Sequence, residues 1–279
     1  MIKFSVLIPT YNNLNYLKLA INSIKDNSIY EHEIILHIND GSDGTLNYAK
    51  SNKLIYTYSN DNIGLCSAIN KASTKVSTQY VLYVHDDMYL CKNWDQILEN
   101  EIKSLDNDLF YFSGTNYENR DIDMSFNPGN SPEQFNPNDF HKFCVTKNEK
   151  DLQGSHWAPH IISKRLWDVV GGFSEEFNPG DGSDSDFNMK LWKVGVRFFK
   201  GLNQFKVYHF GSISMRKKAD IVKNDGTKIF LKKWGITPKF FFKYYLRTGD
   251  RFDGLLNNPS KNINFYMELL VCKIKKILS

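Results

Sequence analysis

Two adjacent aspartates, Asp86 and Asp87, follow the apolar run Tyr80–Val84. Carboxylates in such a position supply hard oxygen ligands, which suit Mg²⁺ or Mn²⁺. A diphosphate group would complete the coordination of an ion held there, so the pair is a candidate site for a metal and a phosphorylated ligand. A polar turn before a helix is the alternative interpretation of the same two residues.

The chain has none of the glycine-rich loops that usually hold phosphates after a first strand. Neither GxGxxG nor GxxxxGK[ST] follows the first apolar run, Phe4–Ile8. Such loops mark dinucleotide-binding Rossmann domains and P-loop nucleotide-binding proteins. Their absence argues against both classes and makes a divalent metal the expected holder of phosphate.

The elements that must position these side chains alternate between strands and helices. Short apolar runs predict strands, and apolar residues at helical spacing, such as Leu14, Leu17 and Ile21, predict the helices between them. The alternation indicates an α/β fold with a Rossmann-like, mostly parallel central sheet and helices on both faces. The expected strands cover residues 4–8, 34–38, 54–58, 80–84 and 108–112.

Polar clusters stand at the ends of several expected strands. Thr10–Asn13, Asn39–Ser42 and His85–Asp87 each follow an apolar run directly. In open α/β sheets, ligands bind beyond the carboxyl ends of the strands. We therefore expect the three clusters to contribute to one site.

The pattern changes after residue 115. Residues 116–151 are rich in Asn, Asp and Pro and have weak periodicity, so we expect a long, mainly irregular connection there. Regular elements return with helices expected over 164–170 and 184–194. Short strands are expected over 197–199 and 206–208.

Six segments, taken in order, resemble the motifs of family 2 glycosyltransferases. That family has the GT-A fold and moves a sugar from a nucleoside-diphosphate sugar to an acceptor hydroxyl with inversion. Together the segments cover about Lys3 to Ser214, and their order and spacing carry the resemblance. They are Val6–Asn12, Asn39–Thr45, Asn62–Gly64 with Ala68 and Asn70, His85–Asp87, Gly171–Phe173 with Asp184–Phe187, and Val207–Ser212.

The resemblance implies a donor pocket, with a UDP-type donor favoured, in the first half of the chain. Asp40 would accept a hydrogen bond from the donor base, typically the N3–H of uracil, because a carboxylate can only accept. Thr10, Asn62 and Gly64 would line the same pocket, and Asp86 would contact the ribose or support the metal site. A turn aspartate that bonds its own backbone is the alternative for Asp40.

The resemblance also implies a metal and a base. Asp87 would be the main ligand of a divalent Mn or Mg ion, with His209 near it; a locally bonded strand-end histidine is the alternative for His209. Asp184 would take the proton of the acceptor hydroxyl, while the metal offsets charge on the diphosphate. Asp186 is the alternative base, in which case Asp184 only caps the next helix.

Three positions depart from the family pattern. His85 stands where the family has its first acid, Ile69 where many relatives have an arginine, and Ser183 where an acid precedes the base. The basic cluster Arg216–Lys218 would replace the lost phosphate contact. These departures keep a catalytically inactive, sugar-binding relative open as an alternative. A sugar nucleotidyltransferase is a second alternative, disfavoured because such enzymes usually open with a glycine-rich loop.

Acceptor-side residues are expected in the segment Gly154–His160. Trp157, with His156 beside it, would stack on a sugar ring of a glycan or glycolipid acceptor; a core tryptophan is the alternative. The resemblance implies three parts. These are a donor-binding half over 1–115, an acceptor-binding and catalytic half over 116–215, and a helical extension over 216–279.

Composition limits the partners and the compartment. A net charge of +4 is too small to indicate a nucleic-acid partner. The four cysteines are scattered, without a CxxC pair, which argues against a zinc site and favours a reducing cytoplasm. No apolar run reaches the roughly 18 residues of a membrane span. We expect a cytoplasmic protein, with peripheral membrane contact open.

The segment Phe265–Leu278 predicts a helix with one broad apolar face and lysines on the other side or at its border. Such a helix resembles an interfacial membrane helix that meets anionic head groups. Packing of the apolar face on the catalytic domain, or on a second copy in a homodimer, is the alternative. The face comprises Met267, Leu270, Val271, Ile274, Ile277 and Leu278, and the lysines are Lys273, Lys275 and Lys276.

Overall fold

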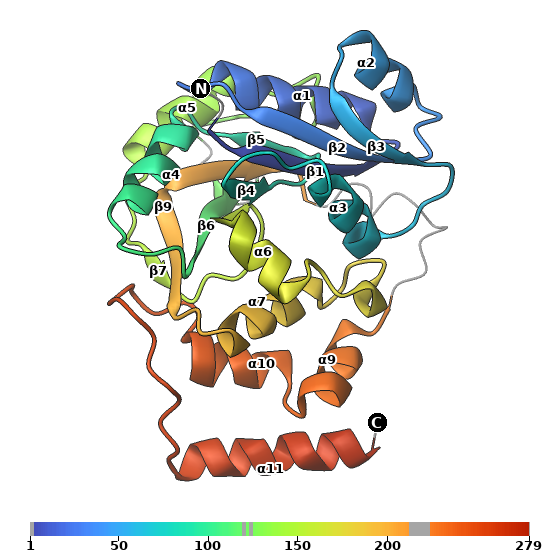
Figure 1. Ribbon diagram of the computed structural model, residues 1–279. Coiled ribbons are helices and arrows are strands. Elements are labelled where there is room, and N and C mark those ends of the chain that lie inside the picture. Colours follow the sequence, from blue (N-terminus) through green and yellow to red (C-terminus); the bar gives the residue numbers. More distant parts are fainter. Residues whose placement is uncertain (1–2, 119–120, 123–124, 212–223, 279) are drawn as a thin grey trace.

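The computed structural model describes residues 3–118, 121–122, 125–211 and 224–278 (Figure 1). The basic cluster Arg216–Lys218 lies outside the described residues. Nine strands form one sheet: β1 (Ser5–Tyr11), β2 (Glu33–Asn39), β3 (Ile55–Ser59), β4 (Tyr80–Tyr83), β5 (Met88–Leu90), β6 (Phe110–Tyr117), β7 (Leu152–Gln153), β8 (His160–Ser163) and β9 (Phe198–His209).

The strand order is β3-β2-β1-β4-β8-β6-β9-β5, with β7 on the side of β9. Strands β1 to β4 run parallel, in a register that puts Thr10 beside Ile38 and Tyr11 beside Asn39. Strand β8 is antiparallel to both β4 and β6, and β6 runs parallel to β9. The predicted α/β fold with a mostly parallel sheet is confirmed.

Helices cover both faces of this sheet (Figure 1). Helices α1 and α2 lie on one side, and α3, α6 and α7 lie on the other. The helices are α1 (Leu14–Asp26), α2 (Thr45–Ser51), α3 (Leu65–Ser73), α4 (Trp94–Lys103), α5 (Pro137–Thr146), α6 (Lys164–Val170), α7 (Ser183–Lys193), α9 (Gly226–Trp234), α10 (Pro238–Phe241) and α11 (Ile263–Leu278), with the short turns η2 (Glu175–Phe177) and η3 (Phe242–Leu246).

The apolar periodicity explains how the helices dock. Helix α1 buries Leu17, Ile21 and Ile24, the residues that recur at helical spacing in its sequence. Helix α3 buries Cys66 and Ile69 against strands β1 and β2. Strands β1 and β2, which lie between these helices, are buried on both faces, as expected for parallel strands covered by helices.

The expectation of two separate short strands near the end of the sheet is wrong, and the expected irregular segment contains one helix. Residues 198–209 form one long strand, β9, which pairs with β6 over most of its length and with β5 on its other side at residues 207–209. The segment 116–151 contains a helix, α5, whose first turn is capped by the Asn136 side chain and begins with Pro137. Phe140 and Phe143 bury one side of α5.

The C-terminal helices lie beyond α7, away from the sheet (Figure 1). Phe230 of α9 and Phe241 of α10 are buried, and their rings are 6.2 Å apart. Helix α11 lies along the outer side of α9 and α10. In the described part of the chain, none of the helices is long and apolar enough to cross a bilayer.

Candidate active site

The carboxyl ends of β1 and β4 meet around Asp86. The Thr10 hydroxyl donates to Asp86 Oδ2 at 2.7 Å, and Asn13 Nδ2 donates to Asp86 Oδ1 at 3.1 Å. All three side chains are buried. The contacts fix the orientation of the Asp86 carboxylate, so it enters the site already positioned.

Asp40 occupies the turn that follows β2. Its backbone is left-handed, with φ of 61°, and Gly41 continues the turn with φ of 74°. Asn12 Nδ2 donates to Asp40 Oδ2 at 2.6 Å, while the Ser42 backbone N–H donates to Oδ1 at 3.2 Å. The carboxylate therefore makes the local turn contact that aspartates favour, and it is also held from β1.

Asn62 and Gly64 form the turn before α3. The exposed Asn62 accepts the Gly64 N–H at 3.0 Å. A side chain at Gly64 would strike Asn178, whose Oδ1 accepts the Cys66 N–H at 2.9 Å. Asn178 thus caps the start of α3 from a distant segment, a contact that sequence spacing gave no means to find.

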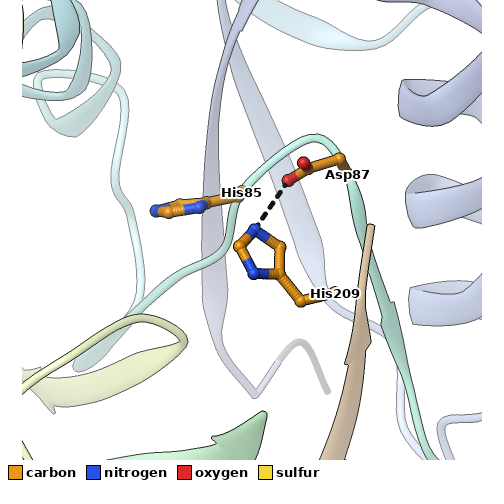
Figure 2. Close-up of side chains that lie close together, drawn as sticks. All are labelled: His85, Asp87 and His209. Carbon is orange, nitrogen blue, oxygen red and sulfur yellow. Dashed lines mark ion pairs between the residues drawn. The ribbon is translucent and has the colours of Figure 1, made fainter. Parts of the chain in front are cut away.

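His85, Asp87 and His209 form a cluster with the chemistry of a metal site. One ligand atom from each lies within 4.8 Å of the other two. His209, at the end of β9, turns toward Asp87, with Nε2 3.3 Å from Oδ1 (Figure 2). The pairing of β5 with β9, which sets Met88 beside His209, brings them together. Sequence reasoning left the part played by His85 open, and the structure adds it to this group.

Burial keeps the His85 ring neutral, because it lowers the pKa of His85 to about 4. A neutral imidazole has a free lone pair at neutral pH, as a metal ligand needs. Two imidazoles and a carboxylate are a donor set suited to Mn²⁺. The three residues therefore fit a divalent ion.

Asp184 lies in the first turn of α7 and is half-buried. Burial raises the pKa of its carboxyl to about 7. Among the residues that the structure describes, none forms a hydrogen bond or ion pair with that carboxylate. A carboxylate with this pKa can accept a proton near neutral pH and release it again.

Asp186, two residues further on, is buried and fully engaged. It accepts from Ser174 Oγ at 2.6 Å and from Trp234 Nε1 at 2.8 Å, and it lies 2.9 Å from Lys233 Nζ. Two of these partners belong to α9, so Asp186 ties α7 to the C-terminal helices.

Tyr83 is a buried residue near several carboxylates. It ends β4, and its pKa is raised well above the usual value, first by burial and then by the nearby charges of Asp184, Asp86 and Asp87, among others. Because such effects fall with distance, these three aspartates all lie in the neighbourhood of Tyr83. Sequence reasoning treated Tyr83 only as a strand residue.

The Gly171–Phe173 segment sets the position of α7. The Asn70 side chain pairs with the backbone of Phe173, accepting its N–H and donating to its carbonyl, each at 2.8 Å. A side chain at Gly172 would collide with the same amide, 2.3 Å away. The Phe173 ring stacks on Phe187 of α7, with centroids 4.6 Å apart. Gly172 thus allows the backbone before Phe173 to lie close to Asn70 of α3 while the Phe173 ring packs on α7.

His156 and Trp157 lie beside the start of α7, both half-buried. Asn188 Nδ2 donates to the His156 carbonyl at 3.1 Å and to the Asp184 carbonyl at 2.7 Å. Trp157 Nε1 donates to the Gly114 carbonyl at 3.2 Å. The His156 ring stacks on Phe242, with centroids 3.8 Å apart, so these residues connect the site to the C-terminal helices.

Residues 5–159 match the sequence model of Glycosyl transferase family 2. The chain belongs to this family. The match starts with β1 and includes the residues predicted to contact the donor or the metal, among them Thr10, Asp40, Asn62, Asp86 and Asp87. Family membership confirms the resemblance seen in the motifs, and it does not favour a sugar nucleotidyltransferase.

Two curated relatives are similar over most of the chain. A hyaluronan synthase of Pasteurella multocida is 28% identical over 289 residues, covering 98% of this chain and 27% of its own length. A cholesterol galactosyltransferase of Borreliella burgdorferi is 28% identical over 267 residues, covering 87% and 73%. An uncharacterized glycosyltransferase of Rickettsia bellii is 30% identical, covering 52% of this chain and 21% of that protein. The chain thus spans about a quarter or less of two of these relatives.

Solved structures of S. aureus TarS share the fold. Full TarS aligns over 100% of this chain and 44% of its own, with a TM-score of 0.58 and 15% identity. TarS 1-349 in complex with UDP-GlcNAc aligns over 86% and 75%, with a TM-score of 0.52 and 18% identity. This likeness supports the expected GT-A-type architecture.

Proposed function

We propose that the chain transfers a sugar from a nucleoside-diphosphate sugar to an acceptor hydroxyl, with inversion at the anomeric carbon. The observation that carries the proposal is the pairing of two features around Tyr83. These are the His85, Asp87 and His209 cluster, whose His85 ring lies 5.3 Å from the Tyr83 ring, and Asp184, whose pKa is raised to about 7 and whose charge acts on Tyr83. The first suits a diphosphate with a divalent ion, and the second suits a general base.

The donor would bind at the carboxyl edge of β1 to β4. Asp40 would accept from the base, with uracil favoured because its N3–H is a donor, and the fixed Asp86 would accept from the ribose. Thr10, Asn62 and Gly64 would line this pocket. The capture of TarS 1-349 in complex with UDP and with UDP-GlcNAc supports a UDP-type donor.

Asp87 and His209, with His85 beside them, would hold Mn²⁺ or Mg²⁺. The chemistry that such an ion supplies is neutralisation of the negative charge on the leaving diphosphate. The fold of the chain would keep the residues that hold the ion in position. The β5–β9 pairing keeps Asp87 and His209 in reach of each other, and the neutral His85 ring adds no competing positive charge.

Asp184 would remove the proton of the acceptor hydroxyl as the oxygen attacks the anomeric carbon. The new carbon–oxygen bond forms on the face opposite the diphosphate, and the bond to the phosphate oxygen breaks with its electron pair on the diphosphate. Asp186 would not serve as base, because Ser174, Trp234 and Lys233 already engage it. It would instead hold α7 in place.

The acceptor, a glycan or glycolipid, would approach along His156 and Trp157. Asn188 connects the His156 backbone to the Asp184 backbone, so both belong to one wall of the site. The Trp157 ring, anchored through its Nε1, offers an aromatic face of the kind that stacks on sugars.

Donor hydrolysis tests the proposal without knowledge of the acceptor. The chain should release nucleoside diphosphate from a UDP-sugar in the presence of Mn²⁺, and excess chelator should abolish the release. Asp87→Asn should remove metal-dependent UDP binding, measured by calorimetry. Asp168→Asn, which alters an exposed ion pair with Lys164 on α6, is the matched control and should bind like the wild type.

The other outcomes discriminate between functions. Full activity in excess chelator would refute the proposed requirement for a divalent metal ion. Metal-dependent UDP binding without turnover of any donor would identify an inactive, sugar-binding relative. Pyrophosphate release from a nucleoside triphosphate and a sugar phosphate would identify a nucleotidyltransferase.

A further inference from the structure

Helix α11 packs on the body of the protein through a narrow inner stripe. Phe265 and Cys272 are buried, and Leu269 is partly buried. The Phe265 ring contacts Phe240 and Tyr244, with centroids 5.0 and 5.1 Å away. This stripe fixes which side of the helix faces outward.

The outer side of α11 is apolar and open to solvent. At 100° per residue, the outward residues centre on Ile274 and Leu270, directly opposite Phe265 and Cys272. The face predicted from the sequence therefore does not pack on the catalytic domain. The outward residues are Ile263 (78% exposed), Tyr266 (56%), Met267 (62%), Leu270 (58%), Val271 (48%), Ile274 (49%), Ile277 (84%) and Leu278 (81%).

Positive charge borders this apolar face. Lys273 and Lys275 are exposed and, by helical geometry, flank the stripe on its two sides. From residue 225 to the end, the chain has eleven lysines and arginines against four aspartates and glutamates. Glu268, the acidic residue of α11, is paired with Lys243 at 2.5 Å, which leaves the flanking lysines to set the local charge.

We propose that α11 is an interfacial helix that attaches the protein to an anionic lipid bilayer. Its outward stripe would enter the boundary between head groups and acyl chains, while Lys273 and Lys275 meet anionic head groups. Figure 1 shows α11 at the edge of the molecule, with its full length open to one side. The attachment does not depend on the proposed enzymatic function.

A second copy of the chain is less suited than an anionic bilayer to cover this face. Pairing two copies through this face would bring the bordering lysines of both helices together, whereas an anionic surface complements them.

The attachment would be coupled to the catalytic side of the protein. Helix α9, on which α11 lies, supplies Lys233 and Trp234 to Asp186 of α7. Phe242, which follows α10, stacks on His156. The bilayer would therefore lie beyond α9 and α10, on the side of the molecule that carries α7, with the sheet on the far side.

Sedimentation with vesicles tests the proposal on the full 279-residue chain. The wild type should sediment with vesicles of phosphatidylcholine mixed with phosphatidylglycerol, and far less with phosphatidylcholine alone. The double substitution Leu270→Glu with Ile274→Glu should abolish binding. Lys273→Gln with Lys275→Gln should weaken it at least tenfold, because each lysine near an anionic surface contributes about 1 kcal/mol.

Val145→Glu is the matched control, since Val145 is 85% exposed on α5, outside the C-terminal helices. It should bind vesicles like the wild type. All variants change exposed side chains, and circular dichroism checks that each remains folded. Equal sedimentation of the wild type and the Leu270/Ile274 variant would overturn the proposal. So would a dimer, seen by light scattering, that this variant converts to monomer while vesicle binding is absent in both.

Discussion

The edge of the sheet at the carboxyl ends of β1 and β4 and the first turn of α7 both carry aspartates of the proposed site, but the surroundings of these aspartates differ. At the sheet edge, Asp86 is held by Thr10 and Asn13. In α7, the Asp184 carboxylate has no hydrogen-bond or ion-pair partner among the described residues, and burial raises its pKa to about 7.

The difference matches what each group would have to do. A carboxylate that orients a ligand gains from being fixed before the ligand arrives, since less freedom is lost on binding. A carboxylate that accepts a proton needs a pKa near the working pH, and hydrogen bonds to its charged form would lower that pKa. Asp186, in the same helix turn, is instead held by three partners and has a structural position.

The largest effect is expected from Asp184→Asn. Asparagine keeps the shape but cannot accept the proton, so turnover should fall by roughly 10²- to 10⁴-fold while UDP affinity stays unchanged. Steady-state kinetics and calorimetry measure the two quantities separately.

Asp186→Asn is the matched variant in the same turn. Loss of one partner of a buried ion pair should lower the free energy of unfolding by roughly 3 kcal/mol, measured by denaturant titration. Below the unfolding transition its turnover should exceed that of Asp184→Asn. The reverse order of turnover would assign the base to Asp186.

A smaller effect is expected from Thr10→Val. The change removes the hydroxyl that donates to Asp86 and keeps the side-chain volume, so the donor should bind about tenfold more weakly, with little change in turnover at saturation. Thr78→Val is the matched control. It removes a hydroxyl that contacts Ser5 at the opposite end of β1, and it should leave donor affinity unchanged. Equal losses in both variants would mean that Asp86 is not a donor contact.

The sequence was sufficient for strands β1 to β4 and for the polar clusters that follow them, because strand periodicity and strand-end polar residues are local signals, but not for β5, β7 or the full length of β9. It was not sufficient to separate Asp184 from Asp186. Both stand in the predicted first turn of α7, and the partners that engage Asp186 come from Ser174 and from α9, which are distant in sequence.

Long-range packing also determines which side of α11 faces the solvent. Periodicity predicted both the helix and its apolar face, but Phe265, Leu269 and Cys272 form a second apolar edge on the opposite side. That edge packs on α10 and α9, and the predicted face turns to solvent. A single sequence gives no rule for which of two apolar sides a helix buries.

The pH dependence of turnover tests the role of Asp184 most directly. Because burial favours the neutral carboxyl, the ionised base is lost as pH falls through the raised pKa. We therefore expect turnover at saturating donor to rise with pH, with a midpoint near 7, and to level off above it. The residual turnover of Asp184→Asn should lack this acidic limb. A midpoint near the ordinary carboxyl value, or the same limb in Asp184→Asn, would contradict the assignment of Asp184 as the base.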